Sequence, residues 1–249
     1  MFAFIRQQKT EILLLAVGAT ISTLLSFAIA HLWLTPLLGA AVAYPSLLMG
    51  VRRQHYWQTG VLMLLWGVFQ SVAVGLAAAW FPERAAMVIV RGSAVTTEML
   101  HWIATGEGPE GSLRLFLPIH LRNYVLFCSL CCLSVSSAAL FFGTYLLNYM
   151  NFYVAQLVGA SVHPGMALLV GWPIWSVLRV VGFILTGVAL AVVSLKLWAR
   201  SRRQRFPAIV PWSLLRWGVA FVVADIVVKA TLAPLWRSLL HYALLGTWI

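Results

Sequence analysis

The sequence predicts an all-α integral membrane protein, a polytopic bundle of about seven transmembrane helices that forms one domain over residues 1–249. Charged residues make up 9% of the chain and hydrophobic residues 62%, whereas about a quarter of a soluble domain is charged. Residues 12–51 and 123–178 contain no Asp, Glu, Lys or Arg. A spanning helix needs about 20 apolar residues. The apolar stretches lack the alternation of a membrane β-barrel, so helices remain as the spanning element.

The first three spans are bounded by basic residues, tryptophans and prolines. The first covers about 12–33; it resembles a signal peptide because it follows Arg6 and ends at Ala28-Ile29-Ala30, but we interpret it as a transmembrane helix. The second, 37–51, is short and contains Pro45, so it is either a tilted crossing or a re-entrant hairpin that would leave six spans. We favour a crossing. The third covers 57–80 and is closed by Pro82.

Four further spans are expected in the second half of the chain. They cover about 123–147, 151–170, 175–198 and 212–231, and Trp residues at several span ends suit the headgroup region. Asn148 and Asn151 are expected to cap helices at the turn between the first two of these. His163-Pro164-Gly165 should break the 151–170 span. Residues 235–245, after Pro234, are expected to lie at the membrane interface.

The segment 82–122 is the one sizeable extramembrane piece, and we expect an extracytoplasmic loop. Val95, Met99, Trp102 and Ile103 recur at helical spacing. This pattern predicts an amphipathic helix over 93–104 that lies on the membrane surface.

The basic residues predict the orientation. The chain has 17 Lys and Arg against 6 Asp and Glu, a net charge of +11. A basic loop after the sixth span contains no acid, and the positive-inside rule places it and the N-terminus in the cytoplasm of a bacterial inner membrane. Its arginines should contact anionic lipid, and the charge therefore does not indicate nucleic acid. These residues are Arg200, Arg202, Arg203 and Arg205.

Three charged residues lie inside predicted spans: Arg179, Asp225 and Lys229. Counted from the span ends, Arg179 and Asp225 both lie ~6–9 Å below the outer surface. They could pair across a helix interface, and Asp225 and Lys229 share one helix face. A buried ion pair that sets helix register is the simpler interpretation. Part of a proton or ion path is the alternative, although no ionisable group lies deeper.

Histidine and cysteine offer two weaker candidate sites. His31, His120 and His163 could converge on a haem, metal or chlorophyll-type pigment if their helices are neighbours. Interfacial histidines bonded to water or backbone are the alternative, and we predict neither metal nor cofactor. Cys128, Cys131 and Cys132 suit apolar packing better than redox or metal chemistry, because a lone C-x-x-C lacks a second ligand pair.

The second half of the chain resembles the stage II sporulation protein M family of bacterial membrane proteins. The resemblance rests on Leu121-Arg122-Asn123, Leu147-Asn148-Tyr149, Val162-His163-Pro164-Gly165 and the closing helix Ala224–Pro234. Ala167 and Lys229 stand near places where that family has acidic residues, so the role of those acids is not carried over. The resemblance implies a scaffold or accessory subunit without enzymatic activity.

The leading functional hypothesis is therefore a non-enzymatic membrane subunit or scaffold whose partners are other integral membrane proteins. The chain has no nucleophile-and-base motif, and small residues such as Gly182 and Gly187 give its helices faces for close contact. A transport permease is the second hypothesis, and it predicts a polar cavity near the midplane. A redox or pigment-binding subunit that uses the three histidines is the third.

Overall fold

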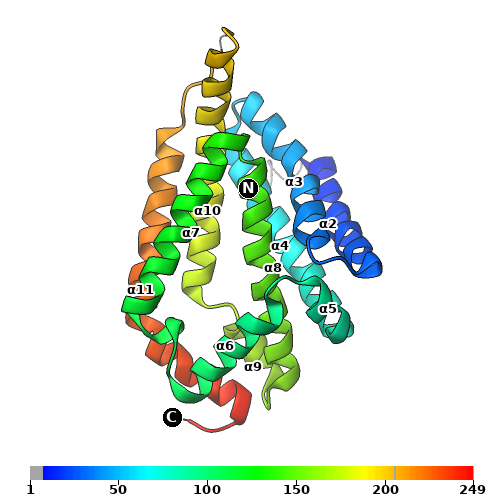
Figure 1. Ribbon diagram of the computed structural model, residues 1–249, viewed down its shortest axis with the longest axis vertical. Coiled ribbons are helices and arrows are strands. Elements are labelled where there is room, and N and C mark those ends of the chain that lie inside the picture. The colour runs from blue at the N-terminus through cyan, green and yellow to red at the C-terminus, as the bar shows by residue number, and fades with distance from the viewer. Residues whose placement is uncertain (1–7, 205, 249) are drawn as a thin grey trace.

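The computed structural model describes residues 8–204 and 206–248, and all regular structure in these ranges is helical (Figure 1). This confirms the predicted all-α class. In chain order the elements are α2 (Lys9–Ile29), α3 (Leu34–Arg52), α4 (Tyr56–Trp80), α5 (Pro82–Val88), α6 (Gly92–Thr105), the 3-10 helix η1 (Pro109–Gly111), α7 (Leu113–Ser134), α8 (Ser137–Ala160), α9 (Pro164–Val170), α10 (Ile174–Ser201) and α11 (Trp212–Leu245).

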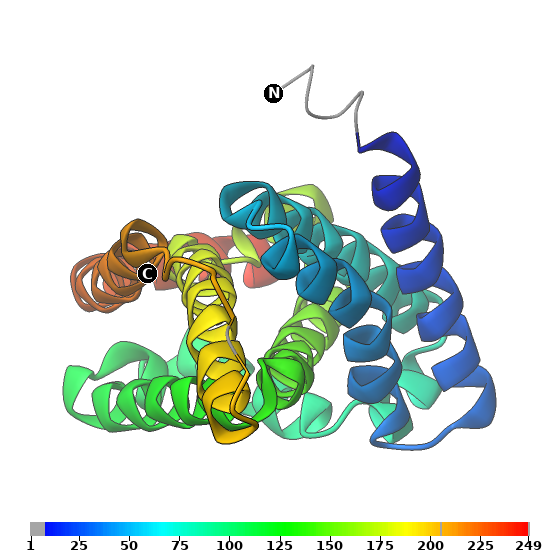
Figure 2. The same cartoon turned by 90° about the horizontal axis from the view of Figure 1, so that it is seen from above.

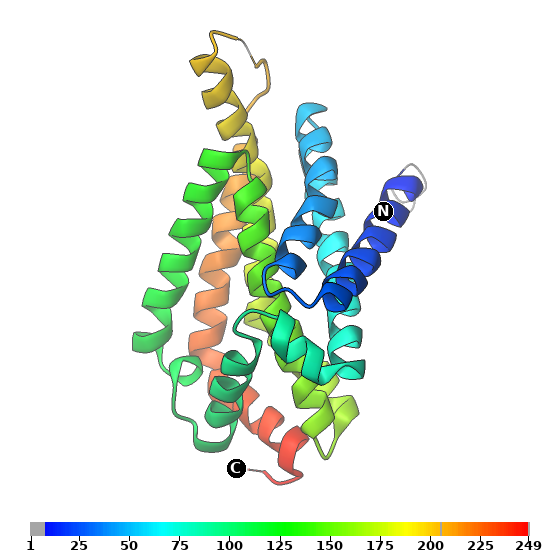
Figure 3. The same ribbon diagram turned by 45° about the vertical axis from the view of Figure 1, so that its right-hand side comes forward.

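Six helices in the described ranges are long and apolar enough to cross a membrane: α2, α3, α4, α7, α10 and α11. The helix α8 is also long, at 24 residues, and carries no charge, but its amide and tyrosine side chains lower its hydropathy. These seven helices run in alternating directions (Figures 1 and 3). The second of them, α3, continues through Pro45 as one helix and is not a hairpin.

The helix α8 lies in the middle of the bundle. Figure 2 shows α2, α3 and α4 on one side of it and α7, α10 and α11 on the other. The helix α8 contacts α10 at few points, whereas α10 and α11 pack against each other along much of their length. One side of α10 is therefore tightly packed and the other is loosely packed.

The predicted spans 123–147 and 151–170 are wrong in position. The chain turns at Val135 and Ser136, both with positive φ (51° and 63°), and α8 passes through Asn148 and Asn151 without a break. Neither asparagine caps a helix; both are buried in mid-helix. The turn is held from α10, because the Ser194 hydroxyl accepts from the Val135 N–H (3.1 Å) and donates to the Cys132 carbonyl (2.6 Å). The expected break at His163-Pro164-Gly165 is confirmed, because α9 begins at Pro164.

Two further boundaries differ from the prediction. The outer segment is shorter than expected, since α7 begins at Leu113 and includes His120. At the other end of the chain, α11 does not stop before Pro234 but continues to Leu245. Proline bends a helix when tertiary contacts hold both halves, and the part of α11 after Pro234 runs across the end of the bundle (Figure 3).

The outer segment is docked on the bundle. The helix α6 occurs at the expected place, and its apolar residues Met99, Trp102 and Ile103 are buried against α8 and α11. Arg237 of α11 donates to the carbonyls of Trp102, Ile103 and Ala104 at 2.9–3.1 Å. A cation at the last carbonyls stabilises a helix C-terminus, so this arginine holds α6 in place.

The two ends of the bundle differ in charge. The end of the bundle that carries the α7–α8 turn also holds the end of α3, the last turns of α10 and the first turns of α11 (Figure 1). These parts of the chain include Arg52, Arg53, Lys196 and Arg216. The exposed Arg200, Arg202 and Arg203 lie at the end of α10, which projects beyond its neighbours. Arg6 and Arg205 lie outside the described residues. The opposite end mixes both signs, with Glu83, Arg84, Arg91, Glu98, Glu107 and Glu110.

Candidate functional site

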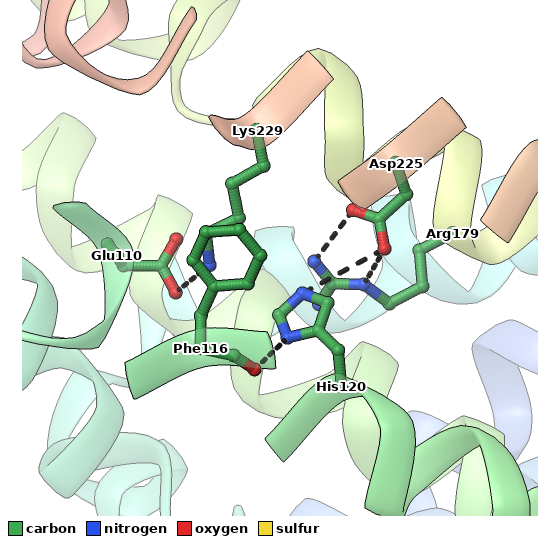
Figure 4. A network of polar contacts seen from close by, with 6 residues as sticks. All are labelled: Glu110, Phe116, His120, Arg179, Asp225 and Lys229. Carbon is green, nitrogen blue, oxygen red and sulfur yellow. Dashed lines mark hydrogen bonds and ion pairs between the residues drawn. The ribbon is translucent and has the colours of Figure 1, made fainter. Parts of the chain in front are cut away.

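A network of buried charges joins α10, α11, η1 and the start of α7 (Figure 4). At its centre, Arg179 Nε and Nη2 donate to Asp225 Oδ2 and Oδ1 at 2.9 and 3.0 Å. The Asp225 side chain is 1% exposed and that of Arg179 25%. Two parallel bonds of this kind fix both distance and orientation. The structure thus joins two of the three intramembrane charges as expected from the sequence.

The third charge, Lys229, has another partner. Its Nζ lies 2.8 Å from Glu110 Oε1, a residue of the short η1 helix, and 4.5 Å from the centre of the Phe116 ring. The Lys229 side chain is 1% exposed and that of Glu110 is 25% exposed. Glu110 was missed in the sequence, where it stands in a turn-rich loop. A buried lysine in need of a counter-ion was the one available signal for it.

His120 lies between the two ion pairs and is the second residue that the sequence did not place in the network. Its Nδ1 lies 3.0 Å from the Phe116 carbonyl, and its Nε2 lies 3.8 Å from Asp225 Oδ2. The carbonyl can only accept, so Nδ1 carries a proton. The buried Nε2 has no hydrogen-bond partner among the described residues.

Close packing of α10 and α11 positions the central pair. A Cβ atom on Gly182 of α10 would lie 2.7 Å from Val222 Cγ2 and 2.9 Å from the carbonyl of Gly218 on α11. Glycine at both positions allows the backbones to approach each other. Arg179 lies about one turn before Gly182, and Asp225 follows Val222 by three residues. The small residues therefore set the helix spacing at which the two charged side chains meet.

A cavity of about 110 Å³ opens on the other side of α10. Helices α3, α4, α7, α8 and α10 line it, and its wall includes both His120 and Arg179. On α8 the lining residues run from Ala139 to Met150, and on α10 from Ser176 to Gly187. Each stretch is about 16 Å of helix. The cavity is therefore a long, mostly apolar slot with His120 and Arg179 at the end nearest the ion pairs, and Asn123, Ser136, Thr144, Tyr149 and Ser176 also lie in its wall.

The other two histidines of the predicted ligand cluster lie elsewhere. His31 is exposed between α2 and α3, and His163 precedes α9, where its ring stacks on Tyr242 at 4.9 Å. Within residues 8–204 and 206–248, no three His, Cys, Asp or Glu side chains come together as a metal site. The expectation that His31, His120 and His163 could converge is therefore wrong: their helices are not neighbours at one depth.

The remaining candidates from the sequence are the three cysteines and the arginines near the end of α10. The three cysteines on α7 are free thiols, with Cys131 buried beside Phe127. At the projecting end of α10, Arg202 lies over the Trp198 ring at 5.3 Å. Its neighbours Arg200 and Arg203 are exposed.

A second polar cluster lies between α3, α4 and α8 and was not expected from the sequence. Thr35, Gln70, Asn148 and Asn151 are at most 2% exposed, and each has a side-chain atom without a partner in the described part of the chain. Gln70 Oε1 and Thr144 Cγ2 both approach Gly39 of α3. Water can satisfy such groups where space allows.

Comparisons with known proteins add no identification: no family model, curated protein or solved structure matches the chain.

Proposed function

We propose that this chain is a non-enzymatic integral membrane protein that binds a small amphipathic molecule in the slot between α8 and α10, as a permease does. The observation that carries the proposal is the cavity itself, which combines a long, mostly apolar wall with Arg179 and His120 at one end. Ligand pockets typically have this composition, with few polar groups that fix orientation.

The walls of the slot are made of residues that leave space. A Cβ on Gly67 of α4 would meet no atom within 4 Å, although this glycine is buried, and one on Gly143 of α8 would meet only Phe127, at 3.8 Å. Interiors are close-packed unless something occupies the space. A void of roughly 150 Å³ accepts a benzene-sized molecule. The present volume of about 110 Å³ is smaller than this and therefore suits only a small molecule or one small group of a larger molecule.

The orientation that we propose has the basic end in the cytoplasm of a bacterial inner membrane. Support comes from the charge difference between the two ends of the bundle, because Lys and Arg concentrate on the cytoplasmic side. A membrane-impermeant maleimide tests this in a variant without native cysteines. It should label Glu107→Cys on intact cells and Arg202→Cys only after lysis, and the opposite result would reverse the orientation.

The subunit hypothesis loses one argument. The small-residue faces that suggested partner helices are partly used inside the chain, since Gly182 packs against α11 and Gly187 lines the slot. Docking to other membrane proteins, and the resemblance to the stage II sporulation protein M family, stay predictions. Copurification from mild detergent tests the first. The pigment hypothesis has lost its histidine cluster, and an absorption spectrum of the purified protein tests it directly.

A pair of matched glycine variants tests the proposed function. Gly67→Leu places a side chain in the slot, whereas Gly75→Leu adds the same group to the same helix outside it, again with no atom within 4 Å of the new Cβ. Native mass spectrometry of protein purified in mild detergent should detect a bound small molecule in the wild type and in Gly75→Leu but not in Gly67→Leu. Equal occupancy in all three would contradict the proposal. Liposome flux of the released molecule then separates transport from binding.

A further inference from the structure

A second pocket, separate from the slot, lies at the end of the bundle opposite the α7–α8 turn. It is formed where the loop after α6 meets the part of α11 around and after Pro234, and both α6 and η1 pack against α11 (Figure 3). Its volume is about 260 Å³, and it is lined by Trp102, Gly106, Gly111, Pro234, Arg237 and Ser238. A void of roughly 150 Å³ already accepts a benzene-sized molecule. The pocket is therefore large enough for a small ligand or for the head group of a larger one.

Two glycines leave hydrogen-bond donors uncovered at the edge of this pocket. A Cβ on Gly106 would lie 2.9 Å from Arg237 Nη1, and one on Gly111 would lie 2.8 Å from Trp102 Nε1. Gly106 also has a φ of +81°, which other residues rarely adopt. Because both glycines line the pocket and the missing side chains would lie against these nitrogens, the guanidinium and the indole N–H both border the open space.

The polar side chains at the pocket are donors with unused capacity. Arg237 uses Nε and Nη2 on the carbonyls at the end of α6, whereas its Nη1 and Trp102 Nε1 have no hydrogen bond to another described residue. The Ser238 hydroxyl donates to the Pro234 carbonyl at 3.4 Å. This distance is long for an O–H···O bond, so the hydroxyl can turn toward a ligand. The pocket thus offers three donors, and a ligand that accepts hydrogen bonds suits it.

Arg237 also supplies a positive charge to the pocket. No carboxylate among the described residues lies within ion-pair distance of its guanidinium, and the carbonyls at the end of α6 carry only partial charges. Of the two acids in the neighbouring loop, Glu110 binds Lys229 and Glu107 is exposed to water, which screens its charge. An anion in the pocket therefore meets a guanidinium whose charge no described carboxylate neutralises.

We propose that this pocket binds a phosphate group, which belongs either to a lipid head group or to a soluble phosphate ester. Arginine and N–H donors are common partners of phosphate in proteins. The donors stand on both walls of the pocket, Trp102 on α6 and Arg237 with Ser238 on α11. A tetrahedral phosphate can accept from both walls because its oxygens point in different directions, whereas a carboxylate is planar. The site is independent of the proposed function of the slot.

Binding of two radiolabelled phosphates to the full-length, delipidated protein tests the proposal: glycerol 3-phosphate and dioctanoyl phosphatidylglycerol. In a nonionic detergent at fixed ionic strength, at least one should bind saturably, and inorganic phosphate should displace it more effectively than acetate does. Loss of one hydrogen bond to a charged group weakens binding about tenfold. Ser238→Ala should show this loss, while Ser213→Ala, an exposed serine near the other end of α11, should match the wild type. Absence of saturable binding of both probes, or equal binding by the two serine variants, would overturn the proposal.

The same measurement identifies the source of the phosphate. If the pocket serves a lipid head group, phosphatidylglycerol binds more tightly than glycerol 3-phosphate, and dioctanoylglycerol, which lacks the phosphate, does not displace it. If the pocket serves a soluble ester, glycerol 3-phosphate binds at least as tightly as the lipid. Displacement of phosphatidylglycerol by dioctanoylglycerol would show that the acyl chains bind and not the phosphate, which contradicts the proposal.

The variant Arg237→Lys tests the guanidinium. Lysine keeps the charge and can still bond the carbonyls at the end of α6, but it lacks the fork that also reaches across Gly106. We expect phosphate binding about tenfold weaker than in the wild type, and thermal unfolding checks that the variant is folded. Binding equal to the wild type would mean that Nη1 is not a contact and would contradict the site. Gly67→Leu, which fills the slot, should leave phosphate binding unchanged, so the two sites are tested separately.

Discussion

Glycine has opposite roles on the two sides of α10: it allows close packing on one side and leaves space on the other. Toward α11, Gly182 and Gly218 bring two backbones into contact, and no added atom would fit. Around the slot, a Cβ on Gly67 of α4 would meet no atom within 4 Å, and one on Gly143 of α8 would meet only Phe127, at 3.8 Å. Arg179 belongs to both sides, since it binds Asp225 of α11 and lines the slot. The difference teaches that small residues on a membrane helix do not by themselves indicate a contact: their neighbours decide between packing and space.

The largest effect on stability is expected from removing one charge of the ion pair between α10 and α11. Asp225→Ala leaves Arg179 without its partner, and loss of one member of a buried pair costs about 3–5 kcal/mol of the free energy of unfolding. Thermal or denaturant unfolding in detergent measures this. The double variant Arg179→Met with Asp225→Leu removes both charges and should recover much of the loss. A double variant as unstable as the single one would show that the pair acts mainly through shape.

The next largest loss of stability is expected from substitution of the glycines between α10 and α11. A Cβ on Gly218 would lie 2.9 Å from the backbone nitrogen of Thr186, so Gly218→Ala must push the helices apart. We expect a loss of about 1–3 kcal/mol from overpacking. Gly75→Ala, which meets no atom within 4 Å, is the control and should change stability by less than about 0.5 kcal/mol. Equal stability of the two variants would contradict the close approach of α10 and α11.

Removal of Glu110 and removal of Lys229 should destabilise the protein to different extents. Glu110→Ala leaves Lys229, which is 1% exposed, charged and without a partner, whereas Lys229→Met leaves Glu110, which is 25% exposed and can reach water. The glutamate variant should therefore lose about 1–3 kcal/mol and the lysine variant clearly less. Unfolding of both variants in one detergent gives the comparison. A larger loss for Lys229→Met would mean that the Glu110 contact is not formed in the membrane.

The smallest effect on stability is expected from a substitution in the slot. Gly67→Leu fills existing space, and cavity-filling changes commonly add about 0.5–2 kcal/mol. We expect the ligand-free protein to gain stability by about the lower of these values. A destabilised Gly67→Leu variant, with Gly75→Leu unchanged, would show that the slot is already closed.

Several helices could be predicted from the sequence because strong local signals mark their ends. The helix α4 lies within one residue of its predicted span, between the Arg52-Arg53 pair and Pro82. The turn at Val135 and Ser136 could not be found, because neither glycine, proline nor charge marks it and a serine 59 residues away holds it. The pair Arg179–Asp225 followed from the scarcity of charge. Glu110 could not be predicted as the partner of Lys229. The slot could not be predicted either, because it depends on the space that packed side chains leave unfilled.

An experimental structure of the protein as purified, in lipid nanodiscs, tests the proposed function most directly. The proposed function predicts density for a small bound molecule between α8 and α10, near Arg179 and His120. An empty slot, or one closed by the side chains around Gly67, would contradict it.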